Sequence, residues 1–247
     1  MHVLSRRTNF DRRVIRIFID IFMTISVSSV PGVQARDKGH VRDVLLLLSF
    51  FISGCSALIY QVSWQRALYA VIGVDMDSIT IIVSVFMLGI GIGGMLGGWL
   101  SDRYPQRRLR LYGWIELSVA LYGGLSLWLL QRLEVLLASG PWSASGVASA
   151  VACFVFLAIP TVLMGITLPL LTMAFNERSG NIGVSVGTLY FINTLGAAAG
   201  AALVPFVLLP VLTLPQVVWT AVAGNVAVVA CALLAATMLA PAVRARA

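Results

Sequence analysis

The sequence predicts an all-α protein, a polytopic transmembrane bundle of about six helices. Of its 247 residues, 59% are hydrophobic and only 11% are charged, whereas an average soluble domain carries about 25% charged residues. The mean hydropathy is +0.94. The apolar residues also form separate runs of about 20 residues or more, the length at which a helix crosses the hydrocarbon core. This composition excludes a soluble enzyme, a disordered chain and a collagen-like fibre.

Six apolar runs are long enough to be spans. They are, in chain order, residues 44–66, 78–101, 111–131, 146–175, 183–210 and 216–240. The fourth run is longer than the hydrocarbon core is thick and contains Pro160 and Pro169, so we expect a kinked or tilted helix there. Pro205 and Pro210 occupy a similar place near the end of the fifth run.

The basic residues lie on alternate sides of these spans. All 17 Lys and Arg residues except Arg66 and Arg132 fall in residues 1–43, in the loops after the second and fourth spans, or in the tail 241–247. Cytoplasmic loops carry an excess of Lys and Arg. We therefore expect a multi-pass protein of the cell (inner) membrane, with a basic N-terminal segment, a bundle over 44–240, a short tail, and both termini in the cytoplasm.

Residues 1–43 carry a polar stripe. A polar residue recurs at every fourth position, at Arg16, Asp20, Thr24 and Ser28. This spacing favours an amphipathic helix that lies in the membrane interface. The same stretch also alternates apolar residues with a period of two, so an extended conformation stays open. Two further alternatives are a signal peptide with residues 33–35 as its cleavage site and a seventh span.

Charge and residue types exclude several classes of function. The net charge of +7 is not accompanied by aromatic residues interleaved with the Lys and Arg residues, so nucleic acid is not an expected partner. The cysteines, Cys55, Cys153 and Cys231, lie in apolar runs, and no CxxC or HxxxH spacing occurs. We therefore expect no disulfide, metal or cofactor, and no residue stands out as catalytic.

Small residues recur at helical spacing in the second and fifth spans. A match to GxGxxG in the second span lacks the strand–turn–helix context of a dinucleotide site. We therefore interpret these glycines as faces that let another helix approach closely. The helix-packing set is Gly89, Gly93, Gly94, Gly97, Gly98, Gly196 and Gly200.

Glu116 is the one acidic residue that lies well inside a predicted span. A carboxyl group in hydrocarbon is costly and usually has a partner or a function, and the candidate partners are Gln61, Arg66 and Asn193. A protonated carboxyl group that is hydrogen-bonded to a neighbouring helix is the alternative. The hypothetical substrate-binding set is Glu116, Gln61, Arg66, Tyr190 and Asn193.

Other polar residues of the spans have structural interpretations. Trp64 and Arg66, late in the first span, fit an interfacial anchor and a snorkelling cation. Thr161 and Thr167 lie beside the prolines of the fourth span. There we expect their hydroxyls to bond backbone carbonyls that proline leaves free.

The loop after the second span resembles a motif of major facilitator superfamily transporters. In that family the motif reads G-x-x-x-D-R-x-G-R-R, and its Asp and Arg form a charged latch near a helix end. Asp102 and Arg103 match the motif after Gly98, whereas Pro105 and Gln106 depart from it. The alternative is an ordinary basic loop with an acidic residue at a helix end.

Three longer segments together resemble one family. Residues 53–66 resemble the pattern SGxxALIYExxWxR, residues 159–170 resemble LPTxLMGxTLPLL, and residues 187–197 resemble GxLYxxNTxGA. These patterns are those of the membrane domain of the fused major facilitator/spermidine synthase proteins. The resemblance covers about residues 44–240 and implies a bundle resembling half of a major facilitator transporter. Gln61 departs from the Glu that is usual in the family.

The resemblance also implies a function. In that family the bundle is usually joined to a cytoplasmic domain resembling spermidine synthase, which transfers an aminopropyl group from decarboxylated S-adenosylmethionine to putrescine. We expect that domain to be absent here, so that the chain is not an enzyme by itself. The leading hypothesis is that the bundle binds or passes a small amine or polyamine, or anchors a separate synthase.

Two alternatives belong to other classes of protein. One is a transporter half that dimerises and carries a substrate unrelated to polyamines, since transporter folds are often assembled from repeated bundles. The other is a membrane-bound aminopropyltransferase. The expected partners are the lipid bilayer and either a separate synthase-like domain or a second copy of this chain.

Overall fold

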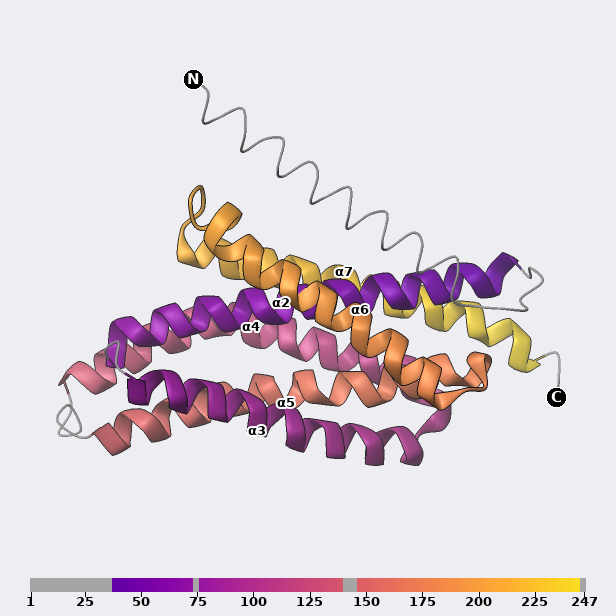
Figure 1. Ribbon diagram of the computed structural model, residues 1–247, viewed down its shortest axis with the longest axis horizontal. Coiled ribbons are helices and arrows are strands. Elements are labelled where there is room, and N and C mark those ends of the chain that lie inside the picture. The colour runs from indigo at the N-terminus through magenta and orange to yellow at the C-terminus, as the bar shows by residue number, and fades with distance from the viewer. Residues whose placement is uncertain (1–36, 73–75, 140–145, 245–247) are drawn as a thin grey trace, which may run out of the picture. The chain divides into compact units, whose positions relative to one another are not determined.

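The computed structural model describes residues 37–72, 76–139 and 146–244, and over these residues it contains helices and turns without a strand (Figure 1). The six long helices are α2 (Asp37–Ile72), α3 (Met76–Arg103), α4 (Arg108–Ser139), α5 (Gly146–Ser179), α6 (Ile182–Leu203) and α7 (Leu214–Arg244). A short 3₁₀ helix, η1 (Pro105–Arg107), precedes α4, and a π-helical turn, η2 (Val204–Leu208), follows α6. The all-α prediction is confirmed.

All six of these helices are long and apolar enough to cross a membrane. The candidate spans are Val41–Tyr69, Ile82–Arg103, Pro105–Leu136, Val151–Glu177, Ile182–Leu208 and Leu214–Thr237. They match the six predicted runs and differ from them by a few residues at the ends. The chain therefore has the architecture of a multi-pass membrane protein. The amphipathic helix and the signal peptide proposed for the N-terminal segment lie outside the described residues, apart from 37–43, which begin α2.

Two compact units make up the chain, residues 1–44 and residues 45–247. In the first unit, the described residues form the start of α2, where Arg42 Nε lies 3.7 Å from Asp43 Oδ1. The rest of α2 and the other helices belong to the second unit. Here the turns after α3 and α5 lie at one end, because Arg108 at the start of α4 contacts Glu177 near the end of α5. The side of the membrane on which they lie stays a prediction.

Glycines let α3 and α5 approach each other closely. A Cβ atom at Gly97 would lie 2.6 Å from the Ile166 carbonyl oxygen, and one at Gly93 would lie 2.8 Å from the Gly165 Cα atom. Because no side chain larger than hydrogen fits there, this face of α3 packs directly on the α5 backbone. Gly89 belongs to the same face and meets Thr161.

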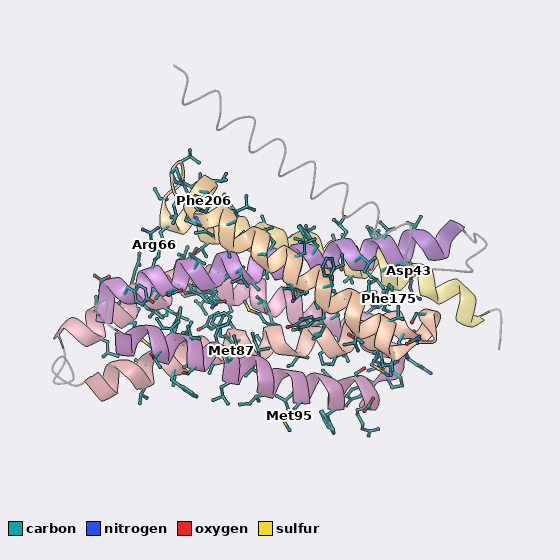
Figure 2. All side chains as sticks on the ribbon, viewed as in Figure 1. Asp43, Arg66, Met87, Met95, Phe175 and Phe206 are labelled. Atoms are coloured by element: carbon teal, nitrogen blue, oxygen red, sulfur yellow. The ribbon has the colours of Figure 1, made fainter. Side chains whose placement is uncertain are left out.

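The opposite face of α3 is open. A Cβ atom at Gly94 or Gly98 would meet nothing within 4 Å. Met95 on this face is 80% exposed and points away from the bundle (Figure 2). The two glycine rows that the sequence grouped together are therefore different: one contacts α5, and the other contacts no part of the described chain.

Glycines also join α2 and α6. Gly196 and Gly200 abut the backbone of Phe51 and Cys55, and Gly54 abuts the backbone and side chain of Asn193. Both partners contribute small residues, so the two helices cross with their backbones close together. This contact places Asn193 against Gly54, the residue after Ser53.

Both prolines of the fourth span lie within the continuous helix α5. Pro160 has no N–H, so the Phe156 carbonyl four residues earlier loses its helical donor. The Tyr122 hydroxyl of α4 donates to that carbonyl at 2.5 Å. The Thr161 hydroxyl instead donates to the Leu157 carbonyl oxygen at 2.7 Å, and the Thr167 hydroxyl donates to the Met164 carbonyl oxygen at 2.7 Å. The expectation that the threonines bond the carbonyls freed by proline is therefore wrong, because Pro160 and Pro169 free the carbonyls of Phe156 and Gly165.

Candidate functional site

Glu116 lies on the buried stripe of α4. Leu109, Tyr112, Glu116 and Ala120 follow one another at intervals of three and four residues, and none is more than 4% exposed. This spacing places all four on one helix face. The third of them is a carboxyl group in a stripe that is otherwise apolar or aromatic, and its residue is only 1% exposed.

Two hydrogen bonds hold the Glu116 carboxyl group. Ser53 Oγ of α2 donates to Oε1 at 2.6 Å, and Asn225 Nδ2 of α7 donates to Oε2 at 2.5 Å. Ser53 and Asn225 are buried as well. One carboxyl group therefore links three helices, α2, α4 and α7, that are far apart in the sequence.

Two further oxygen atoms around the carboxyl group have no hydrogen-bond partner among the described residues. They are Asn225 Oδ1 and the Tyr112 hydroxyl, and both are buried. The Tyr112 hydroxyl lies close to Ser49, Ser53 and Glu116. A buried polar atom without a partner is unusual and calls for an explanation. We use "the Glu116 site" for Glu116, Ser53, Tyr112 and Asn225.

No cation balances this carboxyl group in the described part of the chain, where the ion pairs are Arg42–Asp43 and Arg108–Glu177. An ionised carboxylate is stabilised by its two neutral donors, but a buried charge without a counter-ion is costly. The arrangement is therefore suited to hold a proton or to accept a cationic group.

Two of the predicted partners of Glu116, Arg66 and Gln61, do not contact it in the described structure. Arg66 is exposed and lies near the far end of α2, about 20 Å along the helix axis from Ser53. Figure 2 shows it at the end of the bundle opposite Phe175. Gln61 is half-buried, and neither residue forms a hydrogen bond or ion pair with Glu116 within the described structure.

The two site residues predicted on α6 differ from each other. Asn193 is half-buried and touches Gly54, the residue after Ser53, whereas the hydrogen bonds of Glu116 within the described structure come from Ser53 and Asn225. Tyr190 is 60% exposed on the same helix. Asn193 therefore lies in the contact between α6 and α2, Tyr190 lies on the outer surface of the bundle, and a role of either residue in substrate binding stays a prediction.

Sequence reasoning missed Ser53, Tyr112 and Asn225. Two signals for them were present: Asn225 is a polar amide inside an apolar run, where such residues commonly bond across helices, and Tyr112 precedes Glu116 by one helical turn. Nothing in the local pattern of α2 distinguishes Ser53 from its neighbour Ser56, because only the helix pairing decides which serine faces α4.

A second buried cluster surrounds Trp64, on α2. Trp64 is fully buried, its Nε1 donates to Ser126 Oγ at 2.9 Å, and its ring stacks on Tyr60 with centroids 4.9 Å apart. Tyr122 and Phe156 meet the same indole edge-on. We use "the Trp64 cluster" for these residues. The interpretation of Trp64 as an interfacial anchor is wrong, because an anchor would face lipid and headgroups.

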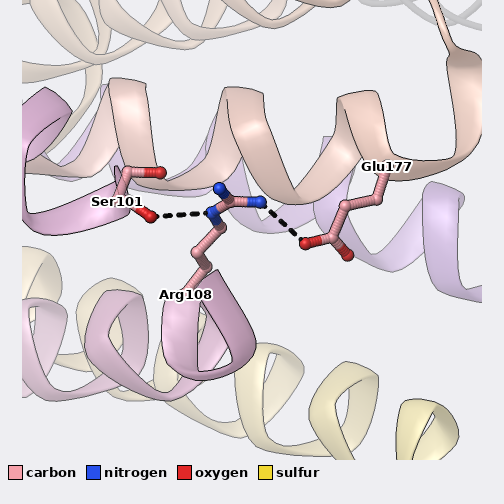
Figure 3. A network of polar contacts seen from close by, with 3 residues as sticks. All are labelled: Ser101, Arg108 and Glu177. Carbon is pink, nitrogen blue, oxygen red and sulfur yellow. Dashed lines mark hydrogen bonds and ion pairs between the residues drawn. The ribbon is translucent and has the colours of Figure 1, made fainter. Parts of the chain in front are cut away.

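The charged contact at the end of the bundle uses Arg108 (Figure 3). Its Nε donates to the Ser101 carbonyl oxygen at 3.1 Å and its Nη1 to Glu177 Oε1 at 2.9 Å. These bonds connect the start of α4 with the ends of α3 and α5. Asp102 and Arg103, which match the major facilitator motif, are exposed. Neither forms an ion pair with another described residue.

Comparisons with known proteins give relatives but no family model and no solved structure that matches. The chain is 24% identical over 175 residues to a polyamine aminopropyltransferase of Oceanobacillus iheyensis, covering 71% of this chain and 32% of the relative. It is 30% identical over 172 residues to polyamine aminopropyltransferase 2 of Streptomyces coelicolor, covering 68% of this chain and 30% of the relative. The chain thus spans about a third of the length of the curated relatives it matches.

The chain is a multi-pass membrane protein with six apolar helices. Over about 70% of its length it is distantly related to proteins named polyamine aminopropyltransferase. The names of these relatives refer to aminopropyl transfer, and the likeness to major facilitator transporters stays a prediction.

Proposed function

We propose that this chain is the membrane-embedded part of a polyamine aminopropyltransferase-like system, and that its Glu116 site recognises a small protonated amine. One observation carries the proposal. It is a fully buried carboxyl group without a cationic partner in the described chain, in a protein whose relatives are named for polyamine aminopropyl transfer. A protonated amine would supply the missing positive charge.

The oxygen atoms of the site match the needs of a primary ammonium group, which presents three N–H donors. The Glu116 carboxylate, Asn225 Oδ1 and the Tyr112 hydroxyl can each accept one, and the last two have no other partner among the described residues. Ser53 and the Asn225 amide group keep the carboxylate in place. Charge-assisted bonds of this kind are stronger than neutral ones.

Access to the site requires movement. Glu116 is 1% exposed and its two donors bond it directly. An amine therefore enters only when α2, α4 and α7 separate. This separation breaks the hydrogen bonds of Glu116 with Ser53 and Asn225. Asn193, which touches Gly54 next to Ser53, would be moved by such a separation of α2. Gln61, Arg66 and Tyr190 would take part only in a state with rearranged helices.

In this proposal the bundle binds or passes the amine at the membrane and holds an aminopropyltransferase activity there. That activity would come from a synthase-like domain or partner. The six apolar spans support a membrane role, and the relatives' names support the polyamine class of substrate.

Uptake of labelled putrescine into proteoliposomes tests the proposal. We expect uptake by the wild-type chain and a loss of about 10- to 100-fold with Glu116→Gln, because an amide cannot form the charge-assisted bond. Glu134→Gln is the matched control, since Glu134 lies exposed towards the other end of the same helix. Uptake that is equal in the Glu116→Gln and Glu134→Gln variants would contradict the role of Glu116.

A further inference from the structure

The turn between α3 and α4 exposes three guanidinium groups. Arg103 ends α3, Arg107 ends η1, and Arg110 lies in the first turn of α4, and all three are exposed. The backbone of this turn is ordered by hydrogen bonds from Tyr104 N to Leu100 O at 3.1 Å and from Arg107 N to Tyr104 O at 3.0 Å. We use "the basic turn" for Arg103, Arg107 and Arg110.

The charges of the basic turn are not neutralised by the described chain. The fourth arginine, Arg108, points inward and is paired with Glu177. None of the basic turn's arginines forms an ion pair with a described residue, and Asp102 is the acidic residue within the turn's own sequence. Three exposed positive charges therefore stand against one negative charge.

Exposed tryptophans lie one helical turn deeper than this basic turn. Trp99 precedes Arg103 by four residues on α3 and is 64% exposed, and Trp114 follows Arg110 by four residues on α4 and is 67% exposed. Residues four apart share a helix face. Each helix therefore carries an arginine near its end and an indole one turn further along the helix. In a bilayer, arginines at a helix end reach the headgroups and tryptophans lie at the interface beneath them.

We propose that the basic turn binds the phosphate-bearing headgroup of an anionic phospholipid, with Trp99 and Trp114 against the lipid beneath it. The charge of the turn is opposite to that of the headgroup, and on each helix an exposed indole lies one turn further from the helix end than an arginine. This inference does not rest on the proposed amine site, because none of its residues touches that site.

The other end of α4 offers an internal contrast. There Arg132 lies over the ring of the exposed Trp128, with its guanidinium carbon 5.2 Å from the ring centroid, and Glu134 is exposed two residues further on. This end has an arginine and an indole but no excess of positive charge on the described helix. It is therefore expected to show no preference for anionic lipid.

Native mass spectrometry of the purified full chain tests the proposal, with phosphatidylglycerol and phosphatidylcholine added at equal concentration. We expect the wild-type chain to retain at least about tenfold more phosphatidylglycerol, since each arginine near the surface contributes roughly fivefold. The variant with Arg103→Gln, Arg107→Gln and Arg110→Gln should lose the preference. Arg132→Gln is the control and should keep it.

Several results would overturn the proposal. They are a wild-type chain without a preference, a triple variant that keeps it, or an Arg132→Gln variant that loses it. Displacement of the bound phosphatidylglycerol by equimolar inorganic phosphate would show that a free anion suffices and would also overturn it. If the triple variant does not fold, Arg107→Gln alone is measured, because Arg107 lies on the exposed η1 turn, and a preference reduced by about fivefold is expected.

Discussion

The Glu116 site and the Trp64 cluster both bury polar groups in the apolar bundle. The polar groups of the Trp64 cluster are neutral and stabilise the fold, whereas the Glu116 site contains a carboxyl group. In the Trp64 cluster the bonds repair or extend the local structure: Tyr122 replaces the donor that Pro160 lacks, and Ser126 accepts from Trp64 while it donates to the Gly123 carbonyl at 2.6 Å. Neutral partners are enough for each of these bonds.

The Glu116 site contains an ionisable group. Unlike the Tyr122 hydroxyl, it does not replace a backbone hydrogen bond that a proline removes. Its carboxyl group accepts from two neutral donors, and two nearby oxygens, of Asn225 and Tyr112, have no hydrogen-bond partner in the described part of the chain. The hydroxyls of Tyr60 and Ser63 also have no hydrogen-bond partner among the described residues. They are neutral, and a buried neutral group without a partner costs far less than an uncompensated charge. A missing countercharge, and not an unpaired atom alone, therefore marks a functional candidate.

The largest expected effect on stability is at Trp64. Trp64→Ala removes a fully buried indole together with its bond to Ser126, so we expect a loss of about 3–5 kcal/mol in the free energy of unfolding. Thermal unfolding of the purified chain in detergent measures it. Trp128→Ala, at a site that is 51% exposed, is the control and should cost about 0.5 kcal/mol or less. Equal effects of the two changes would contradict a structural role for the cluster.

A smaller effect is expected at Tyr122. Tyr122→Phe leaves the Phe156 carbonyl without a donor, at a cost of about 1–3 kcal/mol. Pro160→Ala gives the helix back the missing N–H, so the two changes should partly compensate. A double-mutant cycle by the same unfolding assay measures the coupling. Additive effects would show that Tyr122 does not serve this carbonyl.

The smallest effect on stability is expected at Glu116. In Glu116→Gln the amide oxygen can still accept from one donor, and removal of a buried charge offsets the lost bond, so the free energy of unfolding should change by roughly 1 kcal/mol or less. The unfolding assay used for Trp64 checks this. A loss as large as that of Trp64→Ala would place Glu116 among the structural groups and break the comparison.

The helices were predictable because hydropathy is a local property of each segment. All six spans follow from run length, and Glu116 was recognisable because a carboxyl group inside such a run is conspicuous without knowledge of its neighbours. The glycine face that meets α5 also follows from spacing. The spacing does not predict that Gly94 and Gly98 face away from α5, because both sets of glycines have the same local pattern.

The partners were not predictable, because they depend on which helices pair. Glu116 meets Ser53 and Asn225 through the packing of α2 and α7 on α4, and no spacing within one run encodes that packing. Trp64 was misassigned since an aromatic residue late in a span fits both an interfacial anchor and a buried core. In the same way, Arg108 rather than Arg103 makes the charged contact because α5 supplies Glu177.

Equilibrium binding of labelled spermidine to the purified chain in lipid nanodiscs tests the central claim most directly. We predict saturable binding to the wild-type chain, equal binding to Glu134→Gln, and affinity lowered by about 10- to 100-fold in Glu116→Gln although that variant unfolds like the wild-type chain. Binding of spermidine with the same affinity to the folded Glu116→Gln variant would contradict the claim that Glu116 recognises the amine.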